Sequence, residues 1–538
     1  MKKIMIALIG CMILSACSED ILNLKNPAQY DEVTYFKTQK ECQEVVAACY
    51  SVLTMRPFYG RDWYFMMDLL TGQSTKTSNL EVDLVKFEEF TYQPEHQYID
   101  WAWLGFYRLG MRSLVAIEKL TAWETKSEAE KAYKDVMLGE AYFFYGWAYY
   151  FLSELWGDVP FHESWESIKA EPAKARTPYA EVQQKVEEAF TTALSKLPES
   201  WDDKNLGRVT KDAARAMLGK VYLTKGDNDK AIQQLESVKA SAFHPNYHKL
   251  FVRGNHTSPE IIMQVLHKFW GWGDGNAYYM FGGKEDWGNK ATNCGRHMEY
   301  AWNDWNNVTV SNGAAAKFKY MLNGAEYIDP RNKDIMYGDG VMGSDRWFGF
   351  HYTKDNAPSA DKIGQLVEYF DDDGKLIDNG TKFPYKPYDG TTLTGYKWKK
   401  GCLYEDFEHV DIGDGDYSSI LIRVSDVKLL LAEAYIGKAN YAKAKDLINE
   451  VRTRDAVKAV AYTDLNSSNA FEILKRERYI ELFGENHYWM DLLRWDRLGK
   501  VDMMKELPSA ASAKHKKWPI PTQEKDTNPK MVVTDAWN

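Results

Sequence analysis

The chain has 538 residues, and at about 150 residues per domain this length suits three or four domains unless one large fold takes them all. Its formal net charge of −10 excludes a protein that holds the phosphate backbone of nucleic acid through surplus Lys and Arg. A hydrophobic fraction of 45% excludes a disordered polypeptide, while the aromatic fraction of 14%, with 19 Trp, exceeds what packing of an ordinary soluble chain requires.

The N-terminus indicates a secretion signal with a lipid attachment site. Lys2 and Lys3 precede an apolar run over residues 4–14, which is too short to cross a bilayer of about 30 Å. The run ends in Leu-Ser-Ala-Cys, which resembles a bacterial lipobox. We therefore expect residues 1–16 to be removed as a signal peptide and Cys17 to carry lipid. Cleavage by an ordinary signal peptidase, with Cys17 incidental, is the alternative.

The residues after the lipobox bear on location and charge. Ser18-Glu19-Asp20 is acidic and resembles the signal with which Bacteroidetes send lipoproteins to the cell surface. Because the signal peptide takes two lysines with it, the net charge becomes −12. The sequence therefore predicts an acidic, lipid-anchored protein of the outer membrane that faces the cell exterior.

The cysteines give no support for metal or redox chemistry. The mature chain keeps Cys42, Cys49, Cys294 and Cys402, without a CxxC pair or a Cys/His cluster. Cys42 and Cys49 lie seven residues apart in a helical pattern, a rise of roughly 10 Å, which is too far for a disulfide.

Helix-turn-helix spacing typical of tetratricopeptide repeats occurs at four places. The clearest copy spans residues 212–238, where small residues let two helices approach closely, and a second copy spans 427–454. Looser matches lie at 103–107 and 138–142. The pattern predicts four degenerate helical pairs. We expect them not to form a continuous array, because three precede about residue 245 and the fourth follows about residue 420.

Residues 246–419 differ in character from these repeats. Gly, Asn, Asp and aromatic residues dominate there without a sustained helical period, which predicts a long, loop-rich insertion. Residues 367–370 and 375–377, joined by an Asp-Gly turn, predict one β-hairpin. An irregular segment of this length is usually functional.

The last part of the chain returns to helix. Residues 470–497 have a strong helical pattern, in which Glu477 and Glu481 are one turn apart and Arg478 precedes Glu481 by three residues. This spacing suits structural ion pairs rather than catalysis. Pro519-Ile520-Pro521 then predicts an extended course within the tail, residues 499–538.

Several short motifs together resemble those of the SusD/RagB family of Bacteroidetes surface lipoproteins, and the match runs from the lipobox to the tail. Where the family commonly has Glu-Gly-x-Arg, this chain has Glu485-Asn486-His487-Tyr488, and residues 533–537 replace the usual Gln-Asn-x-Gly-Tyr. The motifs that carry the resemblance are Trp156-Gly157-Asp158-Val159-Pro160, Asp329-Pro330-Arg331, Ile422-Arg423 with Asp426, Ile448-Asn449-Glu450-Val451-Arg452, Glu477-Arg478, Asp491-Leu492 and Asn528-Pro529.

The resemblance implies a mainly α, SusD-like domain over residues 17–538. Its helical scaffold would occupy about 36–245 and 420–498, and the ligand-binding insertion about 246–419. The implied role is to capture oligosaccharide or polysaccharide and to pass it to a SusC-like TonB-dependent outer-membrane transporter. Catalysis and cofactors are not part of that role.

A glycan site needs aromatic rings that pack on sugar faces and short polar side chains that bind hydroxyl groups. Five Trp fall within the 46 residues from Glu260 to Trp305, against about 1.6 expected from the composition. The resemblance places ligand near the stretch that starts at Trp302, and by analogy adds Trp63, Asp68, Gln73 and Asn79. Filling of the core is the competing interpretation for any single ring. The candidates within the insertion are Trp270, Trp272, Tyr278, Tyr279, Trp287, Trp302, Asn303, Trp305 and Asn306.

Other functions have less support in the sequence. The chain contains no G-x-S-x-G, H-E-x-x-H, Walker or dinucleotide-binding motif. A glycosidase needs only two carboxylates at a cleft, so spacing alone does not exclude a glycoside hydrolase. An aromatic platform could also hold a peptide, and repeat grooves elsewhere act as protein scaffolds. We expect the repeats to contact the transporter and the insertion to face ligand.

Overall fold

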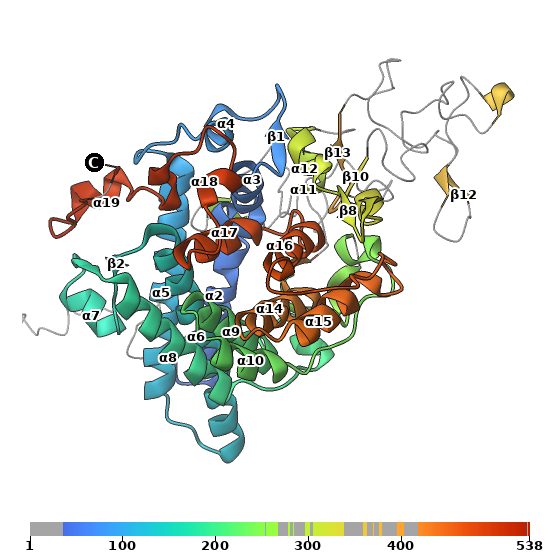
Figure 1. Cartoon of the computed structure of the whole chain (residues 1–538). Coiled ribbons are helices and arrows are strands. Elements are labelled where there is room, and N and C mark those ends of the chain that lie inside the picture. The colour runs from blue at the N-terminus through green and yellow to red at the C-terminus, as the bar shows by residue number, and fades with distance from the viewer. Residues whose placement is uncertain are drawn as a thin grey trace, which may run out of the picture.

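The computed structural model describes residues 36–537 except 253, 267–277, 280–282, 285–295, 302–304, 338–358, 363–368, 371–375, 379–394, 403–417 and 535. Helices dominate this part of the chain, and its named strands form two-stranded antiparallel sheets (Figure 1). The predicted mainly α architecture is therefore confirmed. The predicted lipidation site at Cys17 and residues 1–16 lie outside the described residues.

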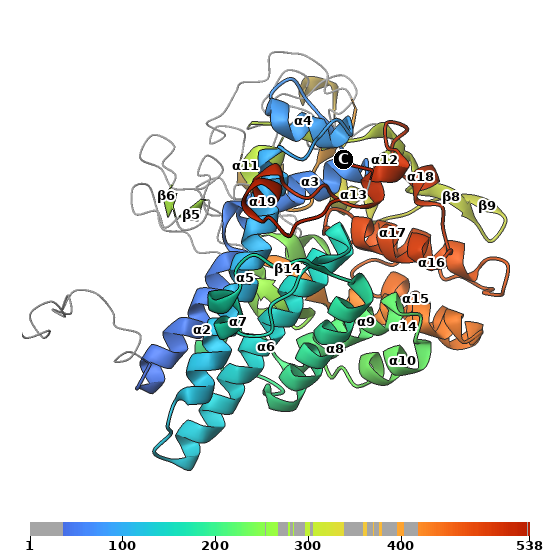
Figure 2. The same ribbon diagram turned by 90° about the vertical axis from the view of Figure 1, so that its left-hand side faces the viewer.

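The N-terminal part of the scaffold is built on four long helices. The helix α5 packs against α2 and α6, and α6 packs against α8 (Figure 2). Side-chain caps begin two of them: Thr38 accepts from the Glu41 N–H at α2, and Ser127 accepts from the Glu130 N–H at α6. The four helices are α2 (Gln39–Leu53), α5 (Gln97–Ala122), α6 (Glu128–Trp156) and α8 (Tyr179–Lys196).

Shorter elements surround these helices. The strands β2 and β3 pair directly after the Trp-Gly-Asp motif that ends α6. The elements are η2 (Arg56–Gly60), α3 (Asp62–Leu70), β1 (Ser74–Lys76), α4 (Val82–Glu88), β2 (Val159–Pro160), α7 (Trp165–Ala170), β3 (Arg176–Thr177) and η3 (Asp203–Asn205).

The two clearest predicted repeats are confirmed as helical pairs. The first is α9 (Lys211–Thr224) with α10 (Asn228–Glu236), and the second is α14 (Val424–Gly437) with α15 (Tyr441–Thr453). A Cβ atom on Gly219 would lie 2.4 Å from Cδ2 of Leu235, so the close approach of the first pair requires glycine. The looser matches fall within α5 and α6, which pack against each other.

The expectation that the helical pairs do not form a continuous array is wrong. The helix α10 packs directly on α14, so the pair that precedes the insertion in sequence adjoins the pair that follows it. Both views show α8, α9, α10, α14 and α15 in one continuous row (Figures 1 and 2). Sequence distance does not prevent this contact, because the insertion leaves and rejoins the scaffold at one place.

Paired strands mark that place. The strand β4 (Ile261–Val265) pairs with β14 (Ser419–Arg423), with Val265 opposite Ser419. Within the insertion β11 (Tyr369–Phe370) pairs with β12 (Leu376–Asp378), which confirms the predicted hairpin. The other elements are η4 (His248–Phe251), η5 (Asn255–Thr257), β5 (Tyr278–Tyr279), β6 (Gly283–Lys284), α11 (Arg296–Tyr300), β7 (Val308–Val310), α12 (Asn312–Ala316), β8 (Lys319–Leu322), β9 (Ala325–Ile328), α13 (Asn332–Ile335), β10 (Met336–Tyr337), η7 (Ala360–Lys362) and β13 (Lys397–Trp398).

The helical pattern predicted over residues 470–497 forms two helices, α16 (Ala470–Glu481) and α17 (Tyr488–Arg497). Gly484 and Asn486 between them have φ angles of 70° and 66°. A Cβ atom on Gly484 would lie 2.8 Å from the ring of Trp398, so the insertion packs against the break and leaves no room for a side chain. Asn tolerates the left-handed conformation better than most residues, which explains how this chain accommodates Asn486 where the family commonly has Gly.

The tail is partly helical, which the extended prediction did not include. It contains α18 (Met503–Glu506), η8 (Ala513–Lys516) and α19 (Thr522–Thr527). Between the last two, Trp518 is 1% exposed and its backbone N–H donates to the carbonyl of Leu155 at 2.7 Å. The tail therefore returns to the end of α6 and closes the main hydrophobic core.

Candidate functional site

Two loops that are far apart in sequence meet because β1 and β7 pair. The register places Ser74 opposite Val310 and Lys76 opposite Val308. In an antiparallel pair, the residues that follow one strand lie beside those that precede the other. The loop after Lys76 therefore meets the loop before Val308, at the end of the molecule where Figures 1 and 2 both show α3 and α4.

Hydrogen bonds from Thr77 and Asn79 join these loops. The Asn79 side-chain N–H donates to the carbonyl of Trp305 at 2.8 Å, and the Thr77 hydroxyl donates to the carbonyl of Asn306 at 2.6 Å. The Thr77 N–H donates to the carbonyl of Asn307 at 3.0 Å. Asn79 is exposed, while Trp305 and Asn306 are half-buried. The structure thus brings together three of the predicted site residues: Asn79, Trp305 and Asn306.

A cluster of buried charged side chains packs against these loops and holds them in place. The Arg61 guanidinium bonds to Glu299, and it lies 2.8 Å from Glu81 Oε1 and 3.5 Å from Asp62 Oδ1. Glu299 in turn accepts from the Asn307 side chain, and its carbonyl accepts from the Asn307 N–H at 2.8 Å. Arg61 and Glu299 are each 2% exposed. The loop before β7 is therefore fixed to the start of α3 by desolvated ionic contacts, which are stronger than those at the surface.

Two carboxyl groups in this cluster titrate differently. Burial raises the pKa of Asp62 to about 6, although Arg56 and Arg61 oppose this shift. Burial also acts to raise the pKa of Glu81, but Arg61, Tyr98 and Arg56 outweigh it, so that the Glu81 pKa lies below its usual value. Glu81 is therefore the better stabilised anion of the two.

Trp63 is a core residue, so the interpretation of this ring as a ligand contact is corrected. It is 2% exposed and packs edge-on against Phe106 and Phe151, with ring centroids 5.6 and 5.5 Å away. Trp518 of the tail lies 6.3 Å away on the same cluster. A sugar cannot reach a ring enclosed in this way. Core packing, the competing interpretation, holds for Trp63.

Asp68 and Gln73, suggested by the same analogy, are also buried. Asp68 is 0% exposed, and its Oδ2 accepts from the Tyr300 hydroxyl at 3.0 Å and lies 3.3 Å from Arg296 Nη2. Gln73 accepts from the Gly484 N–H at 3.1 Å. Both residues join α3 and β1 to neighbouring elements rather than to the surface.

The other predicted contacts cannot be placed. The backbones of Tyr278 and Tyr279 form β5, which lies beside η2, but their side chains are outside the described residues. The remaining candidates outside the described residues are Trp270, Trp272, Trp287, Trp302 and Asn303.

Sequence reasoning missed several residues that shape the site, namely Thr77, Glu81, Glu299 and Arg61. None belongs to a motif, and the three-residue strands that bring them together are too short to recognise in the sequence. Glu81, whose side chain is 36% exposed, accepts from the Tyr98 hydroxyl. The Tyr98 ring in turn packs edge-on against the half-buried ring of Trp101 on α5, with centroids 5.1 Å apart.

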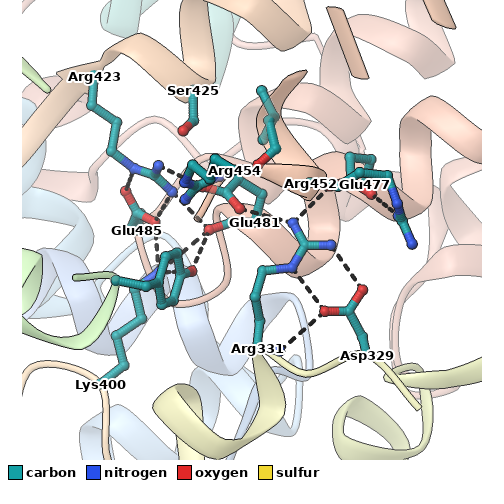
Figure 3. A network of polar contacts seen from close by, with 12 residues as sticks. Asp329, Arg331, Lys400, Arg423, Ser425, Arg452, Arg454, Glu477, Glu481 and Glu485 are labelled. Carbon is teal, nitrogen blue, oxygen red and sulfur yellow. Dashed lines mark hydrogen bonds and ion pairs between the residues drawn. The ribbon is translucent and has the colours of Figure 1, made fainter. Parts of the chain in front are cut away.

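The charged motifs near the C-terminus form a separate buried network (Figure 3). Glu481 lies 2.8 Å from Arg331, 2.6 Å from Arg423 and 2.6 Å from Arg454. Burial disfavours ionisation of Glu481, but these three guanidiniums outweigh it and hold its pKa well below the usual range. Glu477 pairs with Arg331 at 2.6 Å. The prediction of structural ion pairs is confirmed for both glutamates.

Two further points complete this network. Arg423 also pairs with Glu260 and with Glu485, which requires the chain to turn at the break between α16 and α17. Arg478 pairs with Asp426 at 3.0 Å and Asp491 at 2.7 Å, so its ion pairs run between helices. The side chain of Arg478 points toward α14 and α17, which carry these two aspartates.

His487, at the start of α17, should make stability depend on pH. Burial lowers its pKa to about 4; Lys220 and Arg478 also lower it, while Asp426 and Glu485 act to raise it. The unfolded chain binds a proton near pH 6.5, so the contribution of neutral His487 is present above that pH and is lost as pH falls toward 4. Between pH 6.5 and 4, we expect the free energy of unfolding of His487→Asn to fall by roughly 3 kcal/mol less than that of wild type.

Chemical denaturation at a series of pH values checks this expectation. His256→Asn is the matched control, since His256 is exposed. Equal slopes for wild type and His487→Asn between pH 6.5 and 4 would show that His487 does not control the effect.

Comparison with known proteins identifies the family. The model of the SusD family matches residues 274–537, and a second model, described as starch-binding associating with outer membrane, matches residues 20–223. The chain belongs to the SusD/RagB family. SusD-like protein P25 of Formosa agariphila is 21% identical over 94% of this chain and 93% of its own. A SusD-like protein of Bacteroides ovatus is 23% identical, and this match spans about half of each protein, 49%.

Solved structures of SusD-like proteins share the fold. A SusD superfamily protein of Bacteroides vulgatus has a TM-score of 0.69 at 20% identity, covering 93% of this chain and 99% of that one. A laminarin-binding SusD-like protein has a TM-score of 0.65 at 22% identity, covering 92% and 99%. In the described part of this SusD-like chain, no helix is both long and apolar enough to cross a membrane.

Proposed function

We propose that this protein is a glycan-binding lipoprotein of the outer membrane that captures oligosaccharide or polysaccharide and delivers it to a SusC-like TonB-dependent transporter. The observation that carries the proposal is the convergence of Trp305, Asn306 and Asn79 on one accessible pair of loops. A half-buried ring beside the exposed amide of Asn79 has the chemistry that packs on a sugar face and binds its hydroxyl groups. Membership of the SusD/RagB family supports the same role.

The site and the anchor belong to different parts of the chain. Residues 1–16 would be removed, and Cys17 would hold the protein to outer-membrane lipid on the exterior side. The insertion, about 246–419, would contribute the ligand face, and the repeats of the scaffold would contact the transporter. The family description as associating with the outer membrane supports this placement.

Trp305→Ala tests the site. Its glycan affinity should fall by 1–3 kcal/mol, about 5- to 150-fold, if the ring stacks on sugar as aromatic rings stack on bases. Calorimetry with a panel of glycans, using the chain from Ser18 onward, measures this loss. Trp165→Ala is the matched control, because Trp165 is also half-buried but lies on α7. Equal affinity of Trp305→Ala and wild type would move the site toward Trp270, Trp272 or Trp287.

Three further assays separate the alternatives. Binding of peptides with no binding of any glycan would favour a peptide carrier in the same transporter complex. Release of reducing ends from a glycan would establish a glycoside hydrolase. Extraction of native membranes tests the partner: recovery of this chain without any TonB-dependent transporter would contradict delivery.

A further inference from the structure

We propose that the glycan site selects uncharged glycans and that the Glu81 carboxylate is the group that sets this selectivity. The inference rests on the proposed function, because it assigns a ligand class to the same pair of loops. It is carried by the position of Glu81, by the burial of the cations around it and by the charges of the neighbouring surface.

Glu81 occupies a fixed position at the rim of the site. It precedes α4, two residues after Asn79, whose side chain binds the Trp305 loop. The Tyr98 hydroxyl donates to Glu81 Oε2, and Arg61 lies 2.8 Å from Oε1. The side chain is nevertheless 36% exposed. A ligand on these loops therefore meets an oriented, ionised carboxylate.

The positively charged side chains of the cluster are more deeply buried than Glu81. The side chains of Arg56 and Arg61 are 9% and 3% exposed, and both are committed to carboxylates. Two guanidiniums there face the carboxylates of Asp62, Glu81 and Glu299, so the cluster has a net negative charge once Asp62 is ionised. The exposed member is the anion.

The surrounding surface adds no surplus of positive charge among the described residues. On the β1 side, Lys76 pairs with Glu89, while Glu88 accepts from the Thr75 hydroxyl at 2.6 Å and the Lys76 N–H at 2.8 Å. On α4, Lys86 pairs with Asp83 at 2.7 Å. The sequence from Trp302 to Asn307 contains an Asp and no basic residue.

The apolar side chains at this rim can contact a sugar ring whether or not the glycan is charged. Trp101 is half-buried, with Arg56 5.3 Å from its ring centroid. Val82, next to Glu81, is 76% exposed. These groups favour the apolar faces of sugar rings, and the Glu81 oxygens accept hydrogen bonds from hydroxyl groups. A uronate or sulfate at the same place would meet a like charge, and the cations described around it are already paired with carboxylates.

Matched pairs of glycans test the proposal on the intact mature protein. The pairs are soluble starch with carboxymethyl starch, laminarin with sulfated laminarin, and fully methyl-esterified polygalacturonate with polygalacturonate. For any glycan that binds, we expect the neutral member to bind at least tenfold more tightly at low salt. The ratio should shrink toward 1 M salt, where the Debye length is about 3 Å.

Two variants assign the effect. Glu81→Gln keeps the hydrogen-bond acceptor and removes the charge, so the ratio should fall to threefold or less while the unfolding temperature stays near that of wild type. Glu128→Gln makes the same charge change at the start of α6, at the opposite end of the bundle, and should leave the ratio unchanged.

The outcomes separate the two proposals. Charged members that bind as tightly as neutral ones, with binding lost in Trp305→Ala, would overturn the selectivity and leave the glycan function intact. A preference for neutral glycans that survives in Glu81→Gln would overturn the role of Glu81. Failure of all the glycans to bind would overturn the proposed function, and the selectivity with it.

Discussion

Replacing Glu481 by Gln should lower the free energy of unfolding by about 3–5 kcal/mol, the usual cost of breaking a buried ion pair from one side. Glu481 is 0% exposed and faces Arg331, Arg423 and Arg454 at once. The substitution keeps the shape of the side chain and leaves these guanidiniums with one anion fewer, away from water. Denaturation with urea at neutral pH measures the loss.

Glu472→Gln is the control for this substitution. Glu472 lies on the same helix and pairs with Lys475 at 2.9 Å, but its side chain is 61% exposed. Exposed ion pairs contribute about 0–1 kcal/mol, so this variant should be nearly as stable as wild type. A loss below about 1 kcal/mol in Glu481→Gln would mean that the network relaxes around the missing charge.

Trp63→Ala should also cost about 3–5 kcal/mol of stability, because it opens a cavity among close-packed rings. Trp63 touches Phe58, Phe106, Phe151 and Trp518, so the cavity would loosen contacts between η2, α5, α6 and the tail. Thermal unfolding of the variant beside wild type checks the loss.

Ligand binding distinguishes a core ring from a contact ring. Trp63→Phe retains much of the packing, so we expect this variant to fold and to bind glycan as wild type does, in contrast to Trp305→Ala. A folded, stable Trp63→Phe protein with weakened glycan binding would show that the ring takes part in recognition.

The helical scaffold could be predicted because its signals are local. Gly219 and Leu235 lie within one helical pair, and the spacing of small and large residues encodes their contact directly. The Asp-Gly hairpin likewise depends only on adjacent residues. Ion pairing of Glu477 and Glu481 could be predicted from their spacing on one helix, but the identity of their partners could not.

Other features depend on long-range contacts that no short pattern contains. The continuity of the repeats comes from α10 packing on α14 across the insertion, and the break before α17 comes from Trp398 packing on Gly484. The site depends on β1 and β7, strands of three residues each. The sequence does not distinguish Trp63 from Trp305, because the residue type alone does not reveal whether a tryptophan is buried in the core or accessible to ligand.

The pairing of β4 with β14 has a consequence for how such a protein can change. Because Val265 and Ser419 face each other, the chain leaves the scaffold and returns to it at points about 5 Å apart. Lengthening a loop whose ends are already held together costs little conformational entropy. Loops within the intervening segment can therefore be lengthened while the row of helices stays unchanged, as long as Arg331 and Trp398, which pack against α16 and the break after it, are kept. Evolution or an engineer could acquire a new ligand in this way without redesigning the framework.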